Sequence, residues 1–381
     1  MYSLPKDLLC ASKGRQNQTC TKKFFLNASL QVSRTTFKLD SKMKHIKSNL
    51  REHKLLIIIC FFYFLSVFAL DSLTNTQIMG NLAFYYIILN KFLSSFLILF
   101  FSGKTLACLV VNFRSGLSCL PPYFRELRRD YLSRDALLRF GIVYLLIPPF
   151  MCSYSSMKQA IPLLKPFNSD QFLSRLDHFI HFNHNPWDLL QIWLGHPSLT
   201  RFIDFSYMTW GAIFLYSMLW MAYSRRRALR LQFLLSLALC WIFIGNLAAT
   251  LLASVGPCYY SHVKPDALNT YTTMVAYLHS IPDLQATRIQ DALWQAYSVG
   301  KFMPLGGISA MPSMHVSIAV LLALVYSRLH FWVGLPFILY AVLIQIGSVH
   351  LGWHYAIDGY VSIGLTLSIW HMVSRYDLLE T

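Results

Sequence analysis

Long apolar runs constrain this chain more than any other feature of its sequence. The runs "LLIIICFFYFLSVFAL" (residues 55–70) and "LQFLLSLALCWIFIGNLAATLLAS" (231–254) approach or exceed the roughly 18 to 20 residues that cross a bilayer as a helix. Only 13% of all residues are charged, against roughly 25% in a soluble domain. Backbone polar groups inside a bilayer must be satisfied within the segment, so such runs predict helices. The sequence therefore predicts an all-α, polytopic transmembrane helical bundle.

The apolar pattern predicts about eight membrane spans. We place them at 55–73, 82–101, 137–156, 203–223, 231–253, 313–327, 331–349 and 355–373. With the N-terminus inside, 25 of the 33 lysines and arginines fall in segments on one side, so the positive-inside rule predicts that both termini are cytoplasmic. The net charge of +16 then reflects topology and contact with anionic lipid, and no nucleic-acid partner is expected.

Composition divides the chain into four regions. Residues 1–54 are basic and acid-poor, which predicts a disordered cytoplasmic tail, with a transit peptide as the alternative. The other regions are a three-span membrane region (55–157), an outer amphipathic segment (158–202) and a catalytic membrane domain (203–381). In the outer segment, Phe172, Leu176 and Phe179 recur at helical spacing, which predicts amphipathic helices in the interface that could gate lateral lipid entry.

The eight cysteines show no CxxC spacing, so the sequence predicts neither a disulfide framework nor a zinc site. Most of them fall in spans or on the inner side. Buried free thiols are expected, with a Cys152–Cys258 bridge at the outer face as the alternative.

Two polar stretches at helix boundaries carry the candidate chemistry. They are "GGISAMPSMHVSIAV" (306–320) and "HLGWHYAIDGY" (350–360). The spans 313–327 and 331–349 are joined by a short turn, so this hairpin returns both stretches to one outer face. We expect Pro312 at the first helical position, where a missing amide proton costs nothing. The amides and dipole of that helix N-terminus favour an anion such as phosphate.

The histidines and the aspartate in these stretches form a plausible catalytic set. His354 and Asp358 are spaced i, i+4, so on a helix the carboxylate can accept the ring proton and leave the other nitrogen free to attack phosphorus. A phosphohistidine would form while His315 protonates the departing oxygen, and His315 would then activate the acceptor. The residues predicted to bind substrate are Gly307, Ser313, His350, Lys301 and Lys264.

"PSMH" (312–315) followed by "HYAID" (354–358) resembles the second and third signatures of the type 2 phosphatidic acid phosphatase superfamily. The resemblance covers about residues 203–381 and is closest to the branch with fungal inositol phosphorylceramide synthase and bacterial inositolphosphotransferase-like proteins. It implies that His354 is the nucleophile, Asp358 its partner and His315 the acid–base, with no metal or other cofactor. The Lys-x6-Arg-Pro signature is missing, and Ser348 stands where the third signature is preceded by arginine. Lys264, Arg288, Lys301 and His350 remain alternatives for the missing cations.

The missing arginines favour one reaction over another. A phosphomonoester carries nearly two charges and a phosphodiester one, so fewer cations favour a phosphodiester. The prediction is an integral membrane lipid phosphotransferase that moves a phospholipid headgroup to a lipid alcohol or water, with its site on the periplasmic or luminal face. The alternatives are a lipid phosphate or polyprenyl diphosphate phosphatase, and a non-catalytic transporter or scaffold, in which His315→Ala and His354→Ala would leave function intact.

Overall fold

The computed structural model describes residues 43–74, 82–112, 118, 120–264 and 270–377. The chain divides into two compact units, Met1–Glu52 and His53–Thr381. In the first unit the described residues, 43–52, are helical, and the rest of the predicted basic tail lies outside the described residues. The second unit holds all of the elements discussed below.

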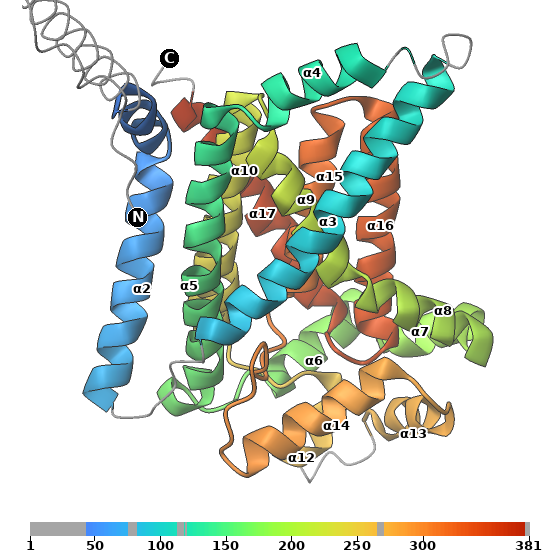
Figure 1. The fold of residues 1–381 in the computed structure, drawn as a ribbon. Helices are drawn as coiled ribbons and strands as arrows, with labels where there is room; N and C mark the ends of the chain where they lie inside the picture. Colours follow the sequence, from blue (N-terminus) through green and yellow to red (C-terminus); the bar gives the residue numbers. More distant parts are fainter. Residues whose placement is uncertain (1–42, 75–81, 113–117, 119, 265–269, 378–381) are drawn as a thin grey trace, which may run out of the picture. The chain divides into compact units, whose positions relative to one another are not determined.

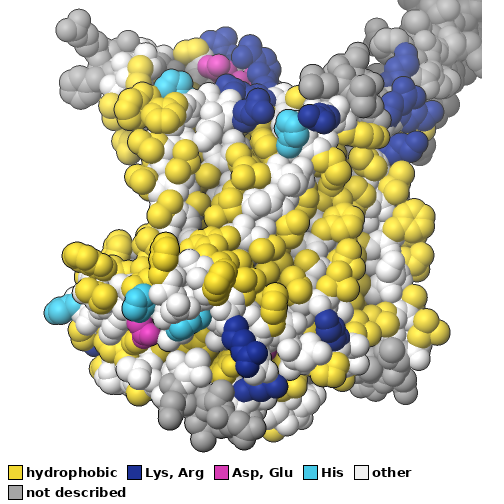
Figure 2. All heavy atoms as spheres, turned by 180° about the vertical axis from the view of Figure 1, so that it is seen from behind, with side chains coloured by type: hydrophobic (Ala, Val, Ile, Leu, Met, Phe, Trp, Pro, Cys, Tyr) yellow, Lys and Arg dark blue, Asp and Glu magenta, His cyan; other side chains and the backbone are white. Residues whose placement is uncertain are grey.

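Five helical segments of the second unit are long and apolar enough to cross a membrane. They are α2 (Lys54–Thr74), α3 (Leu82–Val111), α5 (Arg134–Leu164), the continuous run of α10 (Arg227–Leu239), η2 (Cys240–Ala248) and α11 (Ala249–Leu251), and α16 (Phe331–His350). Large apolar side chains such as Phe61 and Ile98 remain more than half exposed on them. Figure 2 shows hydrophobic side chains over much of the middle of one face. The predicted helical membrane bundle is confirmed.

One predicted span is broken into two helices. The range 203–223 contains the end of α8 (Pro197–Met208) and all of α9 (Trp210–Tyr223), which meet at Thr209. The carbonyl of Ser206 accepts from Thr209 Oγ1 at 2.7 Å and from Tyr340 Oη at 3.0 Å. Side chains thus occupy the acceptor that a continuing helix would offer to the amide of residue 210. The prediction of one uninterrupted helix here is wrong.

The predicted hairpin near the C-terminus is present. α15 (Met314–Ser327) is apolar, although short, and packs along α16. His330 caps the second helix, because its Nδ1 accepts from the amide of Trp332 at 3.2 Å. α17 (Ala356–Asp377) then runs back through the bundle (Figure 1). The start of α15, the end of α16 and the start of α17 therefore lie at the same end.

Short helices gather at this end of the bundle. They are α6 (Asp170–Ile180), α7 (Pro186–Leu194), η3 (Pro257–Tyr259), α12 (Tyr260–Val263), α13 (Thr272–Ser280) and α14 (Gln285–Ser298). Figure 1 shows α6, α7 and α12–α14 at this end, whereas the amphipathic α4 (Leu120–Tyr131) lies across the other. In α6 the apolar Phe172 and Phe179 are exposed, while Asp170 and Asp177 are buried. The predicted helices over 170–194 are present, and α6 carries carboxylates on its inner face.

Cys152 and Cys258 are both buried, and no disulfide joins them. The alternative of a bridge between them is therefore wrong.

Candidate active site

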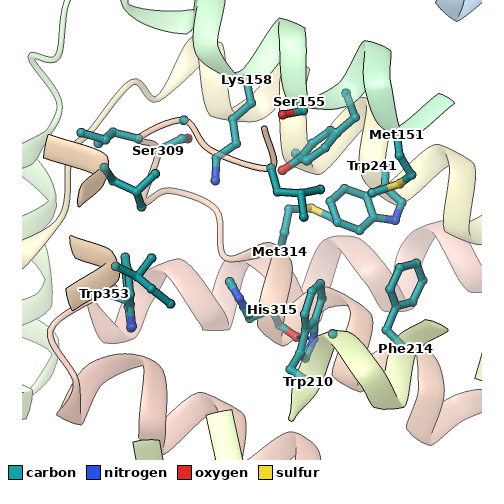
Figure 3. A pocket seen from close by; sticks show the side chains of 18 of the residues that line it. Met151, Ser155, Lys158, Trp210, Phe214, Trp241, Ser309, Met314, His315 and Trp353 are labelled. Atoms are coloured by element: carbon teal, nitrogen blue, oxygen red, sulfur yellow. Dashed lines mark hydrogen bonds between the residues drawn. The ribbon is translucent and has the colours of Figure 1, made fainter. Parts of the chain in front are cut away.

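A cavity of about 350 Å³ lies where α15 begins. Its walls come from α3, α5, α8, α9, η2 and α14, from the loop before α15 and from the loop before α17. Figure 3 shows His315 and Lys158 reaching into this space from opposite walls. His354 also lines the cavity, and the centroids of the His315 and His354 rings are 6.3 Å apart. The two predicted histidines are thus brought together.

His354 is held from behind by Asp358. Its Nδ1 lies 3.3 Å from Asp358 Oδ2, which also accepts from the amide of Tyr355 at 3.0 Å. Asp358 is fully buried, and His354 is 6% exposed. Burial, and then the positive charge of Lys158, lower the pKa of His354 to about 3, against a hydrogen bond with the backbone of Ala310. The ring is therefore neutral near pH 7, which leaves a nitrogen lone pair available for attack.

His315 is held by two aromatic rings. It stacks on Tyr207 with ring centroids 4.7 Å apart and lies against Trp210 at 4.5 Å. The indole Nε1 of Trp210 donates to the backbone carbonyl of His315 at 3.0 Å. Tyr207 and Trp210 flank the break at Thr209, so the interruption between α8 and α9 has a role in placing this histidine.

The helix that carries His315 begins later than predicted. Ser313 has extended backbone angles and is the N-cap of α15, since its side chain accepts from the amide of Val316. Pro312 therefore precedes the cap, and the prediction that it is the first helical residue is wrong. The amide of Ser313 donates to the carbonyl of Asp358 at 3.3 Å, which ties the two sequence stretches together. Ser313 itself is fully buried and does not line the cavity.

Gly307 lines the cavity for a steric reason. Its φ is +104°, and a Cβ there would lie 3.1 Å from the Cγ atoms of both Lys158 and Gln159. Glycine therefore lets the loop before α15 pack against α5.

The other predicted substrate contacts lie elsewhere. His350 faces Thr200, whose Oγ1 is 3.0 Å from Nε2, and it does not line the cavity. Lys264 and Lys301 are also outside the cavity lining. No group of three or more His, Cys, Asp or Glu side chains in the described ranges could hold a metal ion.

Sequence reasoning missed Lys158. Among the cavity-lining residues, all of which are described, it is the one lysine or arginine. It was assigned to an outer loop because the predicted span ended at residue 156, whereas α5 continues to Leu164. A signal was available, since Met151, Ser155 and Lys158 are spaced i, i+4, i+7 and so share a helix face. An ionisable residue on a membrane helix is a functional candidate by default.

Two carboxylates of α6 were also missed, although their spacing of seven residues puts them on one face. Asp177 accepts from the amides of Ala356 and Ile357 at 2.9 and 3.0 Å, which caps α17. Asp170 accepts from the amides of residues 255 and 256 and from Tyr355 Oη. Burial raises the pKa of both aspartates, and these amide donors oppose the shift. α6 therefore holds the loop that carries His354.

Truncation of this cap should destabilise the protein and the site together. Asp177→Ala leaves two buried amides without an acceptor and is expected to cost about 2–4 kcal/mol, with Asp177→Asn losing about half as much. Asp188→Ala is the control, since Asp188 is exposed and accepts one hydrogen bond from Asn185, and it should cost less than about 1 kcal/mol. Unfolding in mixed micelles measures the free energies. Equal stability of Asp177→Ala and Asp188→Ala would contradict the capping role.

Comparison with known proteins bears on the same residues. A model of the PAP2 superfamily matches residues 171–372, which is 202 of the 381 residues of the chain. The match includes His315, His354, Asp358 and Asp177, and begins after Lys158. No curated protein and no solved structure matches the chain. With more than half of its length matched, the chain belongs to the PAP2 superfamily.

Proposed function

We propose that this protein transfers a phosphate-linked headgroup between membrane lipids through a phosphohistidine on His354. The observation that carries the proposal is the pair of histidine rings on one cavity, with centroids 6.3 Å apart. Asp358 is hydrogen-bonded to Nδ1 of His354. Membership of the PAP2 superfamily supports a lipid phosphatase or phosphotransferase function.

In the first step, the free nitrogen lone pair of His354 attacks phosphorus and the bond from phosphorus to the leaving lipid oxygen breaks. His315, in its protonated form, gives its proton to that oxygen, so a neutral lipid alcohol departs. Asp358 accepts a hydrogen bond from Nδ1–H of His354 and stabilises the positive charge that develops on the ring. The products of this step are a lipid alcohol and phosphohistidine.

In the second step, neutral His315 takes the proton of an acceptor hydroxyl. The acceptor oxygen attacks phosphorus, and the phosphorus–nitrogen bond breaks with its electron pair returning to His354. A lipid alcohol as acceptor gives a new headgroup-bearing lipid, and water gives hydrolysis. The enzyme is restored in both cases.

Cation count favours a phosphodiester substrate. The cavity lining holds one lysine, no arginine and two histidines. A dianionic phosphomonoester would leave one negative charge unmatched once His315 has given up its proton, which is costly in a dry site. This supports the inositolphosphotransferase-like branch, in which the phosphoryl group keeps its headgroup throughout.

The proposed catalytic residues lie in the range 203–381, the predicted catalytic domain. α3 and α5 complete the cavity, so the three-span region would contribute to the same enzyme. We place the site on the periplasmic or luminal face, with both termini cytoplasmic, because of the distribution of lysine and arginine in the sequence.

The test uses the full chain in mixed lipid vesicles. Labelled phosphatidylinositol, phosphatidate or polyprenyl diphosphate is supplied with and without ceramide or diacylglycerol, and products are resolved by mass spectrometry. The expected result is a new headgroup-bearing lipid that depends on the acceptor. Free phosphate without acceptor dependence would instead establish a phosphatase. Turnover of no lipid would reject the proposal.

A further inference from the structure

We infer that Lys158, with Ser309 and Trp353, forms the binding site for the substrate phosphate, and that the apolar part of the same cavity holds a hydrocarbon chain of that lipid. This deepens the proposed function and rests on it. The site combines one cation from α5 with two neutral donors from the loops that precede α15 and α17.

Two buried donors in the cavity wall lack a protein partner. Ser309 Oγ and Trp353 Nε1 have no hydrogen bond to any described residue. An indole nitrogen can only donate, and a buried donor that stays unpaired costs about 1–3 kcal/mol. Figure 3 shows both side chains around the space that Lys158 enters. A phosphate supplies the kind of oxygen acceptor that these donors lack.

Lys158 is placed for this role by the packing of its own stem. The loop at Gly307 runs close to this stem, since a Cβ added there would lie 3.1 Å from Cγ of Lys158, and Figure 3 shows the ammonium group directed into the cavity. No carboxylate of the described residues forms an ion pair with it. Its charge reaches His354, whose pKa it lowers. The ammonium group is therefore near the proposed nucleophile and has no competing anion.

The rest of the cavity lining is largely apolar. It includes Ile88, Leu89, Ile147, Met151, Phe214 and Leu215 from α3, α5 and α9, and Figure 3 shows Met151 and Phe214 on the side away from Ser309 and Trp353. Such a surface gains free energy by covering a hydrocarbon chain. A phosphate bound at Lys158 thus has room for its lipid chain alongside, and the ligand is an amphiphile rather than a free sugar phosphate.

The charge balance of this site predicts a singly charged phosphate. Lys158 is the one lysine or arginine of the lining and matches one negative charge, while Ser309 and Trp353 add hydrogen bonds without adding charge. The second positive charge of the mechanism, the proton on His315, leaves with the lipid alcohol. We therefore assign the substrate to the phosphodiester lipids.

The first test compares charge at position 158 in the full-length protein. Lys158→Met should lower kcat/KM for a long-chain phosphodiester tenfold to a hundredfold, because a charge-assisted hydrogen bond is lost, and Lys158→Arg should recover most of it. Lys91→Met is the matched control, since Lys91 is exposed on α3 and does not line the cavity. Equal activity of Lys158→Met and Lys91→Met would overturn the inference.

The second test changes the ligand charge and needs no variant. Hexadecyl phosphate has a second pKa of about 6, so it carries mainly one charge at about pH 5 and two at about pH 8. Its inhibition constant should rise at least tenfold more over that range than that of hexadecyl methyl phosphate, whose single charge does not change and which therefore corrects for any titration of Lys158. The diester also reports any effect of the other titratable groups on the cavity, which are His315, His354, Tyr85, Tyr154, Tyr207 and Tyr259.

The two proposals fail in different ways. Stronger inhibition by the monoester at pH 8 than at pH 5 would overturn the single-charge site and leave His354 chemistry intact. Loss of all turnover in Lys158→Met with recovery in Lys158→Arg supports both. If wild-type protein turns over no lipid but still binds the diester through Lys158, the phosphate site stands and the proposed reaction does not.

Discussion

Replacement of His354 with asparagine is expected to lower kcat by about ten-thousand-fold or more, because the group proposed to attack phosphorus is lost. Asparagine keeps a polar side chain near Asp358 Oδ2 but has no nucleophilic nitrogen. Rates are measured in vesicles on lipid labelled in its phosphate. His371→Asn is the matched control, since His371 is exposed in α17 away from the cavity, and its rate should equal that of wild type.

The His315→Asn variant distinguishes the role of general acid from the role of nucleophile. With a lipid alkoxide as leaving group the variant should lose a hundredfold to ten-thousand-fold in rate, the usual contribution of a general acid. With a long-chain alkyl para-nitrophenyl phosphodiester the first step should lose less than about tenfold, because nitrophenolate departs without a proton. The second step still needs His315 as base, so the variant should release one burst of nitrophenol and retain the phosphoryl group on the protein.

Two outcomes would contradict this mechanism. Labelled protein recovered from His354→Asn would show that another residue carries the phosphoryl group. An equal loss in His315→Asn on both substrates would show that His315 does not protonate the leaving group.

Sequence patterns predicted the parts of the fold that depend on neighbouring residues in the chain. Apolar length predicted α2, α3 and the α10–α11 run, and the short turn at His330 predicted the hairpin that aligns His315 with His354. The predicted contact between His354 and Asp358 is present at 3.3 Å, but His354 lies in the loop before α17 and not on the same helix as Asp358. These features need few distant neighbours, so a sequence pattern is enough.

The parts that were missed depend on neighbours that are distant in sequence. Tyr340 helps to break the span at Thr209 by donating to Ser206, and it lies 134 residues from that carbonyl. Asp177 caps a helix 179 residues away. Periodicity shows which face of a helix is polar, but it does not show which backbone amides will meet that face.

The cations show the same limit. Lys264, Lys301 and His350 lie at the predicted end of the bundle. Membrane depth alone does not show whether a side chain at that end faces the cavity or another part of the bundle. His350 turns toward Thr200, and both lysines lie outside the cavity lining. Lys158 faces the cavity because it lies on the same face of α5 as Met151 and Ser155, which also line the cavity.

Asp358→Asn is the second substitution expected to have a large effect, with a loss in kcat of about a thousandfold or more. Oδ2 of Asp358 receives both the amide of Tyr355 and the ring of His354. If the asparagine oxygen keeps the Tyr355 amide, its nitrogen occupies the place of Oδ1, which is buried without a partner. If the amide turns over, it donates to Nδ1 and holds His354 in the tautomer whose other nitrogen carries a proton. Neither arrangement supplies the carboxylate charge.

A purely structural role for Asp358 can be separated from a positioning role. An unpaired buried amide should cost about 1–3 kcal/mol of unfolding free energy, which lowers the folded fraction but not kcat per folded molecule. Because Asp358 acts through the nucleophile, Asp358→Asn should lose the same factor on the alkoxide and nitrophenolate substrates, whereas His315→Asn should not. Normal kcat in folded Asp358→Asn would show that the buried carboxylate holds the loop in place and does no more. A shared loss on both substrates would instead place the charge of Asp358 behind the attacking nitrogen of His354.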